Sequence, residues 1–210
     1  RPGRRAQSSA LVSDDGRPRL ARPQRVGGDG VPEVFCADEQ TDLAVDLQRW
    51  QQLAFDVLIA EGVRGLAELA VLFVNEREMA ELNDSYMGKP GATDVLAFPI
   101  DAAEAEIVQH GQPPSRGPDR APPDPADMPL LLGDVVICPA VAARQAPDHA
   151  GTVDDEIALR VVHGVLHVLG HDHADPAQRT AMQARERELL ELHHWHGDAP
   201  EAFRQEHADQ

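Results

Sequence analysis

The sequence predicts an α+β fold with four strands and about five helices. Three observations lead to this prediction. Four short apolar segments have the length of strands, five other segments have the apolar spacing or the capping residues of helices, and turns rich in Gly or Pro separate several of them. The chain has 210 residues, of which 42% are hydrophobic, so it can form one domain with a real core.

Four apolar segments predict the strands: VPEVFCA (31–37), ELAVLFV (68–74), DVLAFPI (94–100) and PLLLGDVVICP (129–139). The second is apolar along most of its length, as expected of a buried strand. Pro99 should end the third, because proline has no amide hydrogen to give to a sheet.

Most of the expected helices start at a residue whose side chain can accept a hydrogen bond from the first helical amides. Asp155 follows three residues after Thr152, as in a capping box, and Pro176 directly follows Asp175, which suits the first helical position. The five predicted helices begin at Thr41 or Asp42, at Asn75, at residue 140, at Thr152 and at Asp175. The fourth is apolar nearly all round up to Leu169, so it should be a buried central helix.

Composition divides the chain into one domain and its extensions. Residues 1–30 are rich in Arg, Gly, Pro and Ser without an apolar period, and they are expected to be a disordered basic extension. The domain should cover 31–197. Residues 101–129 contain seven prolines and six acidic residues, which indicates a flexible surface insertion. Residues 198–210 should form a polar tail.

The net charge of −17 argues against a general nucleic-acid coat. The charge is uneven, because residues 1–30 hold seven arginines and three acids and carry +4, which leaves −21 for the rest. A basic RNA-binding arm is one interpretation of that extension. No apolar run is long enough to cross a membrane. The two cysteines, Cys36 and Cys138, do not make a disulfide framework and are expected to be buried thiols in a cytoplasmic protein.

Three histidines have the spacing of a zinc site. His163 and His167 are four residues apart on the central helix, so their side chains share one face. Gly170 can take the left-handed conformation that ends a helix, and the chain can then return a third ligand, His173. The segment matches the H-x-x-x-H-x-x-G-x-x-H ligand frame of metzincin peptidases, so we expect a zincin-like metal helix that binds one zinc ion per chain.

The other histidines fit this frame less well. His171 matches neither spacing and should be exposed or a hydrogen-bond partner of a ligand. His193, His194 and His196 lie near the end of the last helix, where a surface cluster is favoured over a second metal site.

A glycine, Gly164, stands where zinc peptidases have a catalytic glutamate. Three neutral histidines leave one tetrahedral position for water, which is typical of a catalytic zinc site, and zinc alone lowers the pKa of that water towards about 7. A phosphodiester is a substrate whose transition state depends more on charge neutralisation than on a strong base. The expected nucleophile is the metal-bound water, with a hydroxyl group of the substrate as the alternative.

Four segments resemble the YbeY family of bacterial rRNA maturation factors. HGVLHVLGHDH (163–173) is similar to the family signature H-G-x-L-H-L-x-G-x-D-H. ELNDSYMGKPGATDVLAFP (81–99) resembles L-N-x-x-Y-R-x-x-x-x-x-T-D-V-L-S-F-P, LLGDVVICP (131–139) resembles L-G-D-I-x-I-S, and ARQA (143–146) is similar to the Q-A that follows. Together they place residues 32–196, approximately, in the family.

The resemblance implies a four-stranded mixed sheet packed with helices, a cytoplasmic location and a zinc-dependent endoribonuclease that cleaves single-stranded RNA. It also implies 16S rRNA 3′-end processing and ribosome quality control, with ribosomal RNA, small-subunit ribosomal proteins and an assembly GTPase as partners. No membrane partner is expected.

Two residues depart from the family pattern. Met87 stands where the family has an arginine with a catalytic or phosphate-binding role, and Ala97 replaces a serine. Lys89, the chain's only lysine, lies in the same turn and is a candidate phosphate contact, with an ordinary surface lysine as the alternative. Asp94 and Asp134 are candidates for orienting strands or the ligand histidines, and turn capping is equally compatible with their positions.

Two other functions remain open. Met87 and the acidic balance favour a non-catalytic zinc-containing ribosome assembly factor, which pure-protein RNA cleavage would distinguish. A peptidase is a third interpretation, and Gly164 argues against it.

Overall fold

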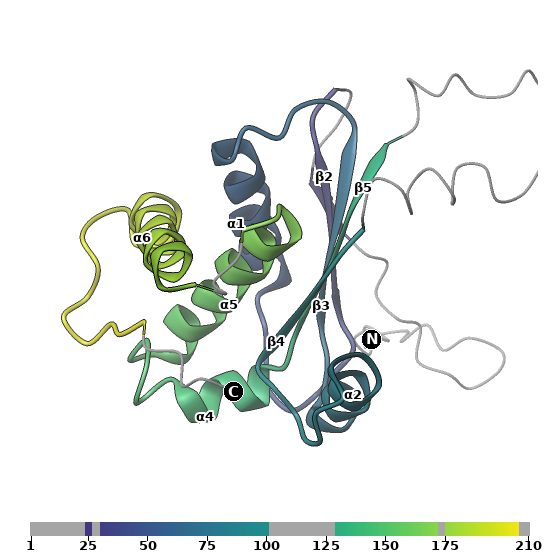
Figure 1. Cartoon of the computed structure of the whole chain (residues 1–210), viewed down its shortest axis with the longest axis vertical. Helices are drawn as coiled ribbons and strands as arrows, with labels where there is room; N and C mark the ends of the chain where they lie inside the picture. Colours follow the sequence, from purple (N-terminus) through teal and green to yellow (C-terminus); the bar gives the residue numbers. More distant parts are fainter. Residues whose placement is uncertain (1–23, 27–29, 101–128, 172–174, 206–210) are drawn as a thin grey trace, which may run out of the picture.

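The structure, a computed structural model, describes residues 24–26, 30–100, 129–171 and 175–205. It shows one mixed β-sheet with three helices, α1, α5 and α6, on one side (Figure 1). Helix α2 lies against the other side, towards one end of the strands, and α4 lies beyond the same end. The predicted α+β class is confirmed.

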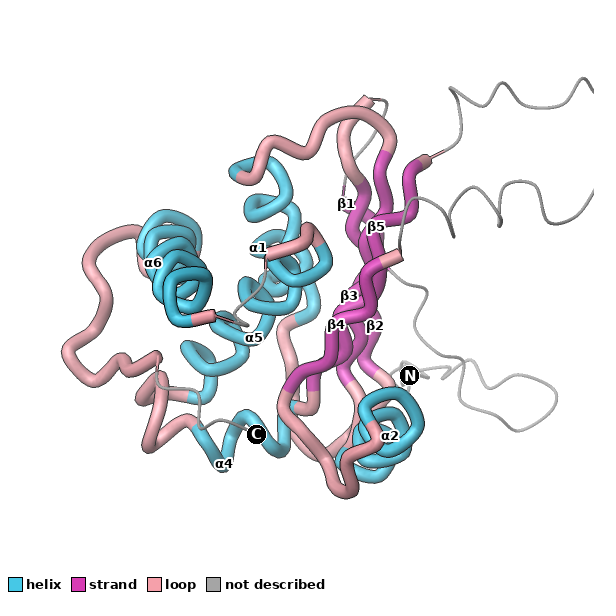
Figure 2. The backbone as a smooth tube through the Cα atoms, in the orientation of Figure 1, coloured by secondary structure: helices cyan, strands magenta, loops and turns pink. Residues whose placement is uncertain are grey.

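The sheet has five strands in the order β1-β2-β3-β5-β4. The strand pairs β2–β3 and β3–β5 are parallel, whereas β1 and β4 pair antiparallel with β2 and β5 at the two edges. Figure 2 shows the strands as one layer beside the helices. The strands are β1 (Gln24–Val26), β2 (Glu33–Asp38), β3 (Ala67–Phe73), β4 (Val95–Pro99) and β5 (Leu130–Ile137). The four longer ones are the four predicted strands, and Pro99 ends β4 as expected.

Strand β1 was not predicted, because residues 1–30 have no apolar period. Three of these residues nevertheless pair with β2, so the prediction of disorder is wrong for 24–26. The edge of β2 supplies backbone partners whatever the side chains are, and composition does not register that kind of pairing. The rest of the predicted extension, 1–23 and 27–29, lies outside the described residues, as does nearly all of the predicted insertion 101–129.

Five α-helices occur in the described ranges, and three of the expected N-caps are confirmed. Asn75 accepts a hydrogen bond from the Glu78 amide, Thr152 accepts one from the Asp155 amide, and Asp175 forms a capping box with Gln178. The helices are α1 (Leu47–Ala60), α2 (Glu76–Leu82), α4 (Pro139–Gln145), α5 (Val153–Val168) and α6 (Pro176–His193), and a π-helical turn, η1 (Asn83–Met87), continues α2.

The predicted start of the first helix at Thr41 or Asp42 is wrong, because α1 begins after Asp46. The Gln40 side chain explains the difference. Its Oε1 atom accepts hydrogen bonds from the amides of Asp42 and Leu43, at 2.7 and 2.9 Å. Its Nε2 atom donates to the Leu43 carbonyl oxygen at 2.7 Å. These bonds satisfy the local backbone in a turn, so the helix starts later.

Two hydrophobic cores lie on opposite sides of the sheet. The larger core joins the sheet to α1, α5 and α6. The smaller core lies around Met79 of α2 and Val136 of β5. Helix α5 is buried on nearly every side, with 13 of its 16 residues buried, which confirms it as the central helix.

The polar tail predicted from residue 198 is not wholly a tail. Phe203 is 7% exposed, and its ring centroid lies 4.7 Å from that of Trp195. The Arg204 amide donates a hydrogen bond to the His149 carbonyl oxygen at 2.8 Å. One aromatic side chain therefore holds this segment on the domain, although its neighbours are polar. Residues 206–210 lie outside the described part.

Both cysteines are buried free thiols, as expected. Burial raises the pKa of the Cys36 thiol to about 12, with a smaller contribution from the nearby Asp38 carboxylate. In the described ranges, no helix combines the length and the apolar character that spanning a membrane would require.

Candidate metal centre

Helix α5 brings two of the three predicted ligands together. The ring centroids of His163 and His167 are 4.5 Å apart and the ring planes are inclined by 76°. Gly170, with a φ of 91°, ends the helix one turn later, as its position predicted. Because the surrounding helix is buried, the two imidazoles project from a rigid element rather than from a loop.

The Glu186 carboxylate of α6 fixes the first of these imidazoles. Its Oε1 atom lies 2.7 Å from Nδ1 of His163, and Glu186 is only 1% exposed. An ionised carboxylate only accepts, so in a neutral imidazole Nδ1 carries the hydrogen and Nε2 keeps the lone pair that a metal ion needs. Metal-binding histidines characteristically donate their other ring hydrogen to a carboxylate in this way. His163 and His167 therefore have the arrangement of two metal ligands, which is the part of the predicted site that the structure describes.

The C-terminal segment holds Glu186 in turn. Nε2 of Gln205 donates to Oε2 of Glu186 at 3.1 Å and to the Gln183 carbonyl oxygen at 2.7 Å. The Gln183 side chain donates back to the Gln205 carbonyl oxygen at 3.1 Å. Both carboxylate oxygens of Glu186 thus have a partner, which a buried charge requires.

Glu186 was not predicted as a site residue, although the sequence contains a signal for it. Met182, Glu186, Leu189 and Leu190 are the buried residues of α6, at helical spacing. A carboxylate on such an apolar stripe needs a buried partner. The sequence does not say which partner, because His163 lies 23 residues away on another helix.

The predicted third ligand, His173, lies outside the described residues. In the part that the structure describes, no group of three or more His, Cys, Asp or Glu side chains could hold a metal ion. The neighbouring His171 has another partner, since its Nε2 atom lies 3.2 Å from Oε2 of Glu61. Arg185 of α6 also binds Glu61, at 2.7 Å. His171 is thus directed to the end of α1, where its partner is not one of the predicted ligands.

Gly164 has a packing role. A Cβ atom on this residue would lie 2.4 Å from Cγ1 of Val135, which is fully buried on β5. Helix α5 therefore packs against the sheet at this glycine. A glutamate would project into the sheet here, so the position cannot supply the general base of a zinc peptidase in this packing.

Arg160, one turn before His163, forms a second buried network that was not predicted. It is 2% exposed, its Nε atom lies 2.9 Å from Oδ2 of Asp94, and its guanidinium also pairs with Glu156. Nδ1 of His149 lies 3.3 Å from the same guanidinium. Asp94 ends the turn that carries Lys89, so this network fastens the turn to the helix of the ligand histidines.

The turn itself is well defined. Gly88 and Gly91 have φ values of 64° and 97°, and the Asn83 side chain donates to the Gly91 carbonyl oxygen at 2.9 Å. Lys89 is exposed, as a phosphate contact must be, and Met87 is 47% exposed. The backbone that carries Lys89 is therefore ordered, as a defined phosphate contact requires.

The two candidate aspartates are separated by the structure. Asp94 accepts a hydrogen bond from the Val95 amide at 2.8 Å, so it caps β4 as well as pairing with Arg160. Asp134 adjoins Val135 on β5 and so points to the opposite side of the sheet from α5. It lines a groove beside α2 and cannot orient the ligand histidines.

The predicted surface cluster of histidines is wrong for His194. Its side chain is 3% exposed, and Nε2 lies 2.8 Å from Oδ1 of Asp155. Trp195 donates to the same oxygen at 2.6 Å. The residues just after α6 fold back on the start of α5, so the His194 side chain is buried.

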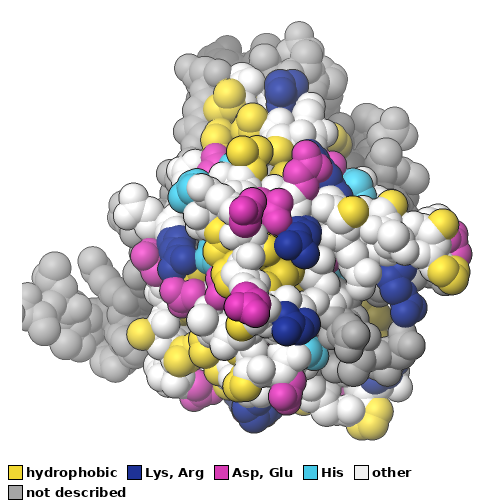
Figure 3. All heavy atoms as spheres, turned by 90° about the vertical axis from the view of Figure 1, so that its left-hand side faces the viewer, with side chains coloured by type: hydrophobic (Ala, Val, Ile, Leu, Met, Phe, Trp, Pro, Cys, Tyr) yellow, Lys and Arg dark blue, Asp and Glu magenta, His cyan; other side chains and the backbone are white. Residues whose placement is uncertain are grey.

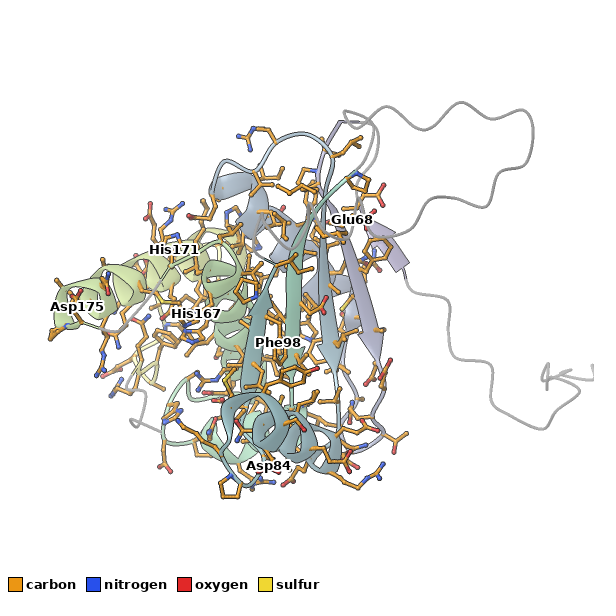
Figure 4. All side chains as sticks on the ribbon, turned by 45° about the vertical axis from the view of Figure 1, so that its right-hand side comes forward. Glu68, Asp84, Phe98, His167, His171 and Asp175 are labelled. Carbon is orange, nitrogen blue, oxygen red and sulfur yellow. The ribbon has the colours of Figure 1, made fainter. Side chains whose placement is uncertain are left out.

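The view onto the α6 side shows basic side chains scattered among acidic ones (Figure 3). Figure 4 places His167 and His171 on this helical side, whereas Phe98 and Asp84 lie towards α2. Helix α5, which carries the candidate ligands His163 and His167, thus lies on one side of the sheet, and the groove beside α2 lies on the other.

Comparison with known proteins identifies the family of this chain. Residues 35–194 match the family described as Endoribonuclease YbeY. The chain belongs to the YbeY family. A relative from Salinispora tropica with the name endoribonuclease YbeY is 44% identical over 154 residues, which are 73% of this chain and 88% of that protein.

Two further YbeY relatives show the same level of similarity. The one from Mycolicibacterium vanbaalenii is 42% identical over 148 residues, 70% of this chain and 72% of its own. The one from Thermobifida fusca is 41% identical over 151 residues, with coverage of 72% and 88%. A solution structure from Thermotoga maritima aligns with 84% of this chain and 99% of its own, at 18% identity and a TM-score of 0.47. The family is one of endoribonucleases, so the chain belongs among nucleases that hydrolyse RNA.

Proposed function

We infer that this protein is a zinc-dependent endoribonuclease specific for single-stranded RNA, with a role in 16S rRNA 3′-end maturation and ribosome quality control. The observation that carries the metal dependence is the hydrogen bond between Nδ1 of His163 and the buried Glu186, beside His167 on α5. This bond gives His163 the tautomer of a metal ligand. Membership of the YbeY family carries the choice of RNA as substrate.

The residues that would hold the zinc ion are His163, His167 and His173. A bound zinc ion supplies Lewis acidity and lowers the pKa of a coordinated water towards about 7. Glu186 keeps the Nε2 lone pair of His163 available for the ion. Lys89 would contact a phosphate oxygen of the substrate, where a fixed cation stabilises the charge that develops during cleavage.

The partners that fit this role are ribosomal RNA, proteins of the small ribosomal subunit and an assembly GTPase, in the cytoplasm. These assignments rest on the family resemblance alone. Affinity purification under conditions that preserve ribosomal particles tests them. Recovery with 30S precursors supports the assignment, and recovery without ribosomal RNA or protein contradicts it.

The nuclease activity is tested with pure protein on a single-stranded RNA and on the same sequence as a duplex. We expect cleavage of the single strand, its loss after chelation and its return when zinc is added back. His167→Ala should remove the activity, and an exposed-site variant, His196→Ala, should keep it. A casein assay should show no peptidase activity, because Gly164 leaves no general base at the required position.

A non-catalytic zinc-containing assembly factor is the second candidate, and Met87 favours it. This residue is 47% exposed at the point where the family resemblance expects a functional arginine. The two candidates differ in one result. The assembly factor binds zinc and ribosomal particles but leaves RNA intact with and without the metal.

A further inference from the structure

The side of the sheet opposite the histidines carries an acidic groove. It has a volume of about 800 Å³ and lies between α2 with η1 and the neighbouring strands. Its apolar residues come from three strands and from α2 and η1, and its four acidic residues are Glu39, Glu78, Glu81 and Asp134. None of the described residues that line it is basic. Tyr86 is 67% exposed at its margin, and its ring centroid lies 5.0 Å from that of Phe98.

The charge of the groove is only slightly offset by its surroundings. Arg77 lies 3.8 Å from both Glu78 and Glu81 but is itself 76% exposed, so it forms two long, solvated contacts. The Oε2 atom of Glu78 is shielded from solvent and has no hydrogen-bond donor among the described residues. An apolar floor with carboxylates around it fits an extended chain that carries arginines.

Two long segments of this chain lie outside the described residues and adjoin the sheet, and their charges differ. Residues 101–128 hold six acids and two arginines, and like charge disfavours them in this groove. Residues 1–23 hold six arginines and two acids. Charge complementarity therefore selects the N-terminal segment.

The direction of β1 also favours the N-terminal segment as the occupant of the groove. Gln24 pairs with Cys36, and β1 runs antiparallel to β2, so the chain before Gln24 approaches from the side of Asp38. The next residue after Asp38 is Glu39, which lines the groove. The segment RPRLARP (17–23) contains two prolines, which favour an extended backbone in the residues before them. Seven extended residues span about 23 Å at most, enough to cross a groove of this size.

We propose that residues 17–23 dock in this groove, with Arg17, Arg19 and Arg22 against its carboxylates and Leu20 on its apolar floor. The arm is then an intramolecular ligand of the sheet. Any other cationic chain that binds here competes with it. The proposal does not depend on the metal centre, which lies on the other side of the sheet.

Tyr86, the chain's only tyrosine, offers a direct test. Full-length protein grown with 3-fluorotyrosine gives one protein ¹⁹F resonance, from the groove itself. A nitroxide on Ala21→Cys should broaden that resonance at low salt, and about 1 M salt should sharpen it again because ion pairs are screened. Cys36 and Cys138 are buried and should not react, which the unmodified chain treated with the same reagent checks.

Two variants decide the outcome. In the background Glu78→Gln, Glu81→Gln, Asp134→Asn, the label at position 21 should no longer broaden the resonance. A label on Asp198→Cys, an exposed position after α6, should leave it sharp. The proposal is overturned if the label at position 21 leaves Tyr86 sharp at low salt, as an arm reserved for RNA would. It is equally overturned if the broadening persists in the neutralised groove.

Discussion

Glu186 is the residue on which the proposed metal centre depends most directly after its proposed ligands. It is buried, it holds the ring of His163 at 2.7 Å, and it is itself held by Gln205. Its charge favours the Nδ1–H tautomer and increases the basicity of the ligand nitrogen. The hydrogen bond to His163 therefore explains why a carboxylate is buried on an otherwise apolar stripe of α6.

Glu186→Gln should weaken zinc binding by about 10- to 100-fold, the usual effect of losing such a hydrogen-bond partner. Competition with a chromophoric chelator measures the affinity. Glu188→Gln is the matched control, since this residue lies on the same helix and its side chain is 66% exposed. Equal zinc affinities for the two variants would show that Glu186 has only a packing role.

Gly164→Ala should destabilise the fold by about 1–3 kcal/mol, the cost of overpacking a dense core. The added Cβ would meet Val135 at 2.4 Å, and a buried β-branched side chain has little freedom to move. This cost exceeds the gain of about 1 kcal/mol that alanine gives within a helix. Urea denaturation measures it. Gly197→Ala, where a Cβ meets no atom within 4 Å, should change stability by less than about 0.5 kcal/mol. A fully stable Gly164→Ala protein would mean that α5 does not pack this closely.

At the scale of elements, the contact between the 88–94 turn and α5 matters most for the proposed chemistry. The Arg160–Asp94 ion pair is buried and joins this turn to α5, one helical turn from His163. Breaking a buried pair leaves an uncompensated charge, so this contact is costly to open. The turn is therefore positioned relative to the helix of the proposed ligands by a contact within the protein.

Lys89→Ala should weaken RNA cleavage or binding without changing the zinc content. The expected loss is about 1–3 kcal/mol, similar to removing a charge-assisted hydrogen bond. The salt dependence of RNA affinity should also decrease, because one fewer phosphate is neutralised. Arg64→Ala removes an exposed cation at the other end of the domain and serves as the control. If both variants cleave RNA with the parent's rate and salt slope, Lys89 is an ordinary surface lysine.

The start of α5 and the end of α6 meet at a contact between two titratable side chains, Asp155 and His194. Burial lowers the pKa of His194 below its ordinary value of 6.5, although the hydrogen bond to Asp155 acts in the opposite direction. Burial would raise the pKa of Asp155, but hydrogen bonds from Thr152, Trp195 and His194 outweigh it and lower the pKa. Neutral His194 beside ionised Asp155 is therefore the folded state of this contact.

Acid should weaken the fold in two steps. The unfolded chain protonates His194 near pH 6.5 while the folded chain does not, so stability falls as the pH drops below 6.5. The contribution of Asp155 is present above its ordinary pKa of 3.8 and is lost as the pH falls through its lower folded value. His194→Gln should flatten the first step in denaturation curves between pH 7 and 5. An unchanged slope in this variant would place the acid sensitivity elsewhere.

Across the whole molecule, the features that depend on a few neighbouring residues were predicted well. Thr152 and Asp175 cap their helices, Gly170 ends α5, and four apolar segments form the longer strands. Each of these features depends on residues within one or two turns. The pairing of His163 with His167 belongs to the same class, because helical spacing alone brings them together.

Features that depend on distant partners were missed. Glu186 on α6 reaches His163 on α5, and Arg160 on α5 reaches Asp94 at the start of β4. The Gln40 side chain delays α1, and only its hydrogen bonds in the folded chain show this. Phe203 returns to the core beside Trp195, although polar residues surround it in sequence. Tertiary packing decides each of these cases, and one sequence does not encode it in a readable pattern.

The central claim is that His163, His167 and His173 hold a zinc ion that makes RNA cleavage possible. Metal analysis of purified protein, run beside the RNA cleavage assay, tests it most directly. We expect about one zinc per chain in the parent and in His171→Ala, with cleavage in both. His173→Ala should lose most of the zinc and the cleavage together. If His173→Ala instead keeps its metal while His171→Ala loses it, the assigned ligand set is wrong.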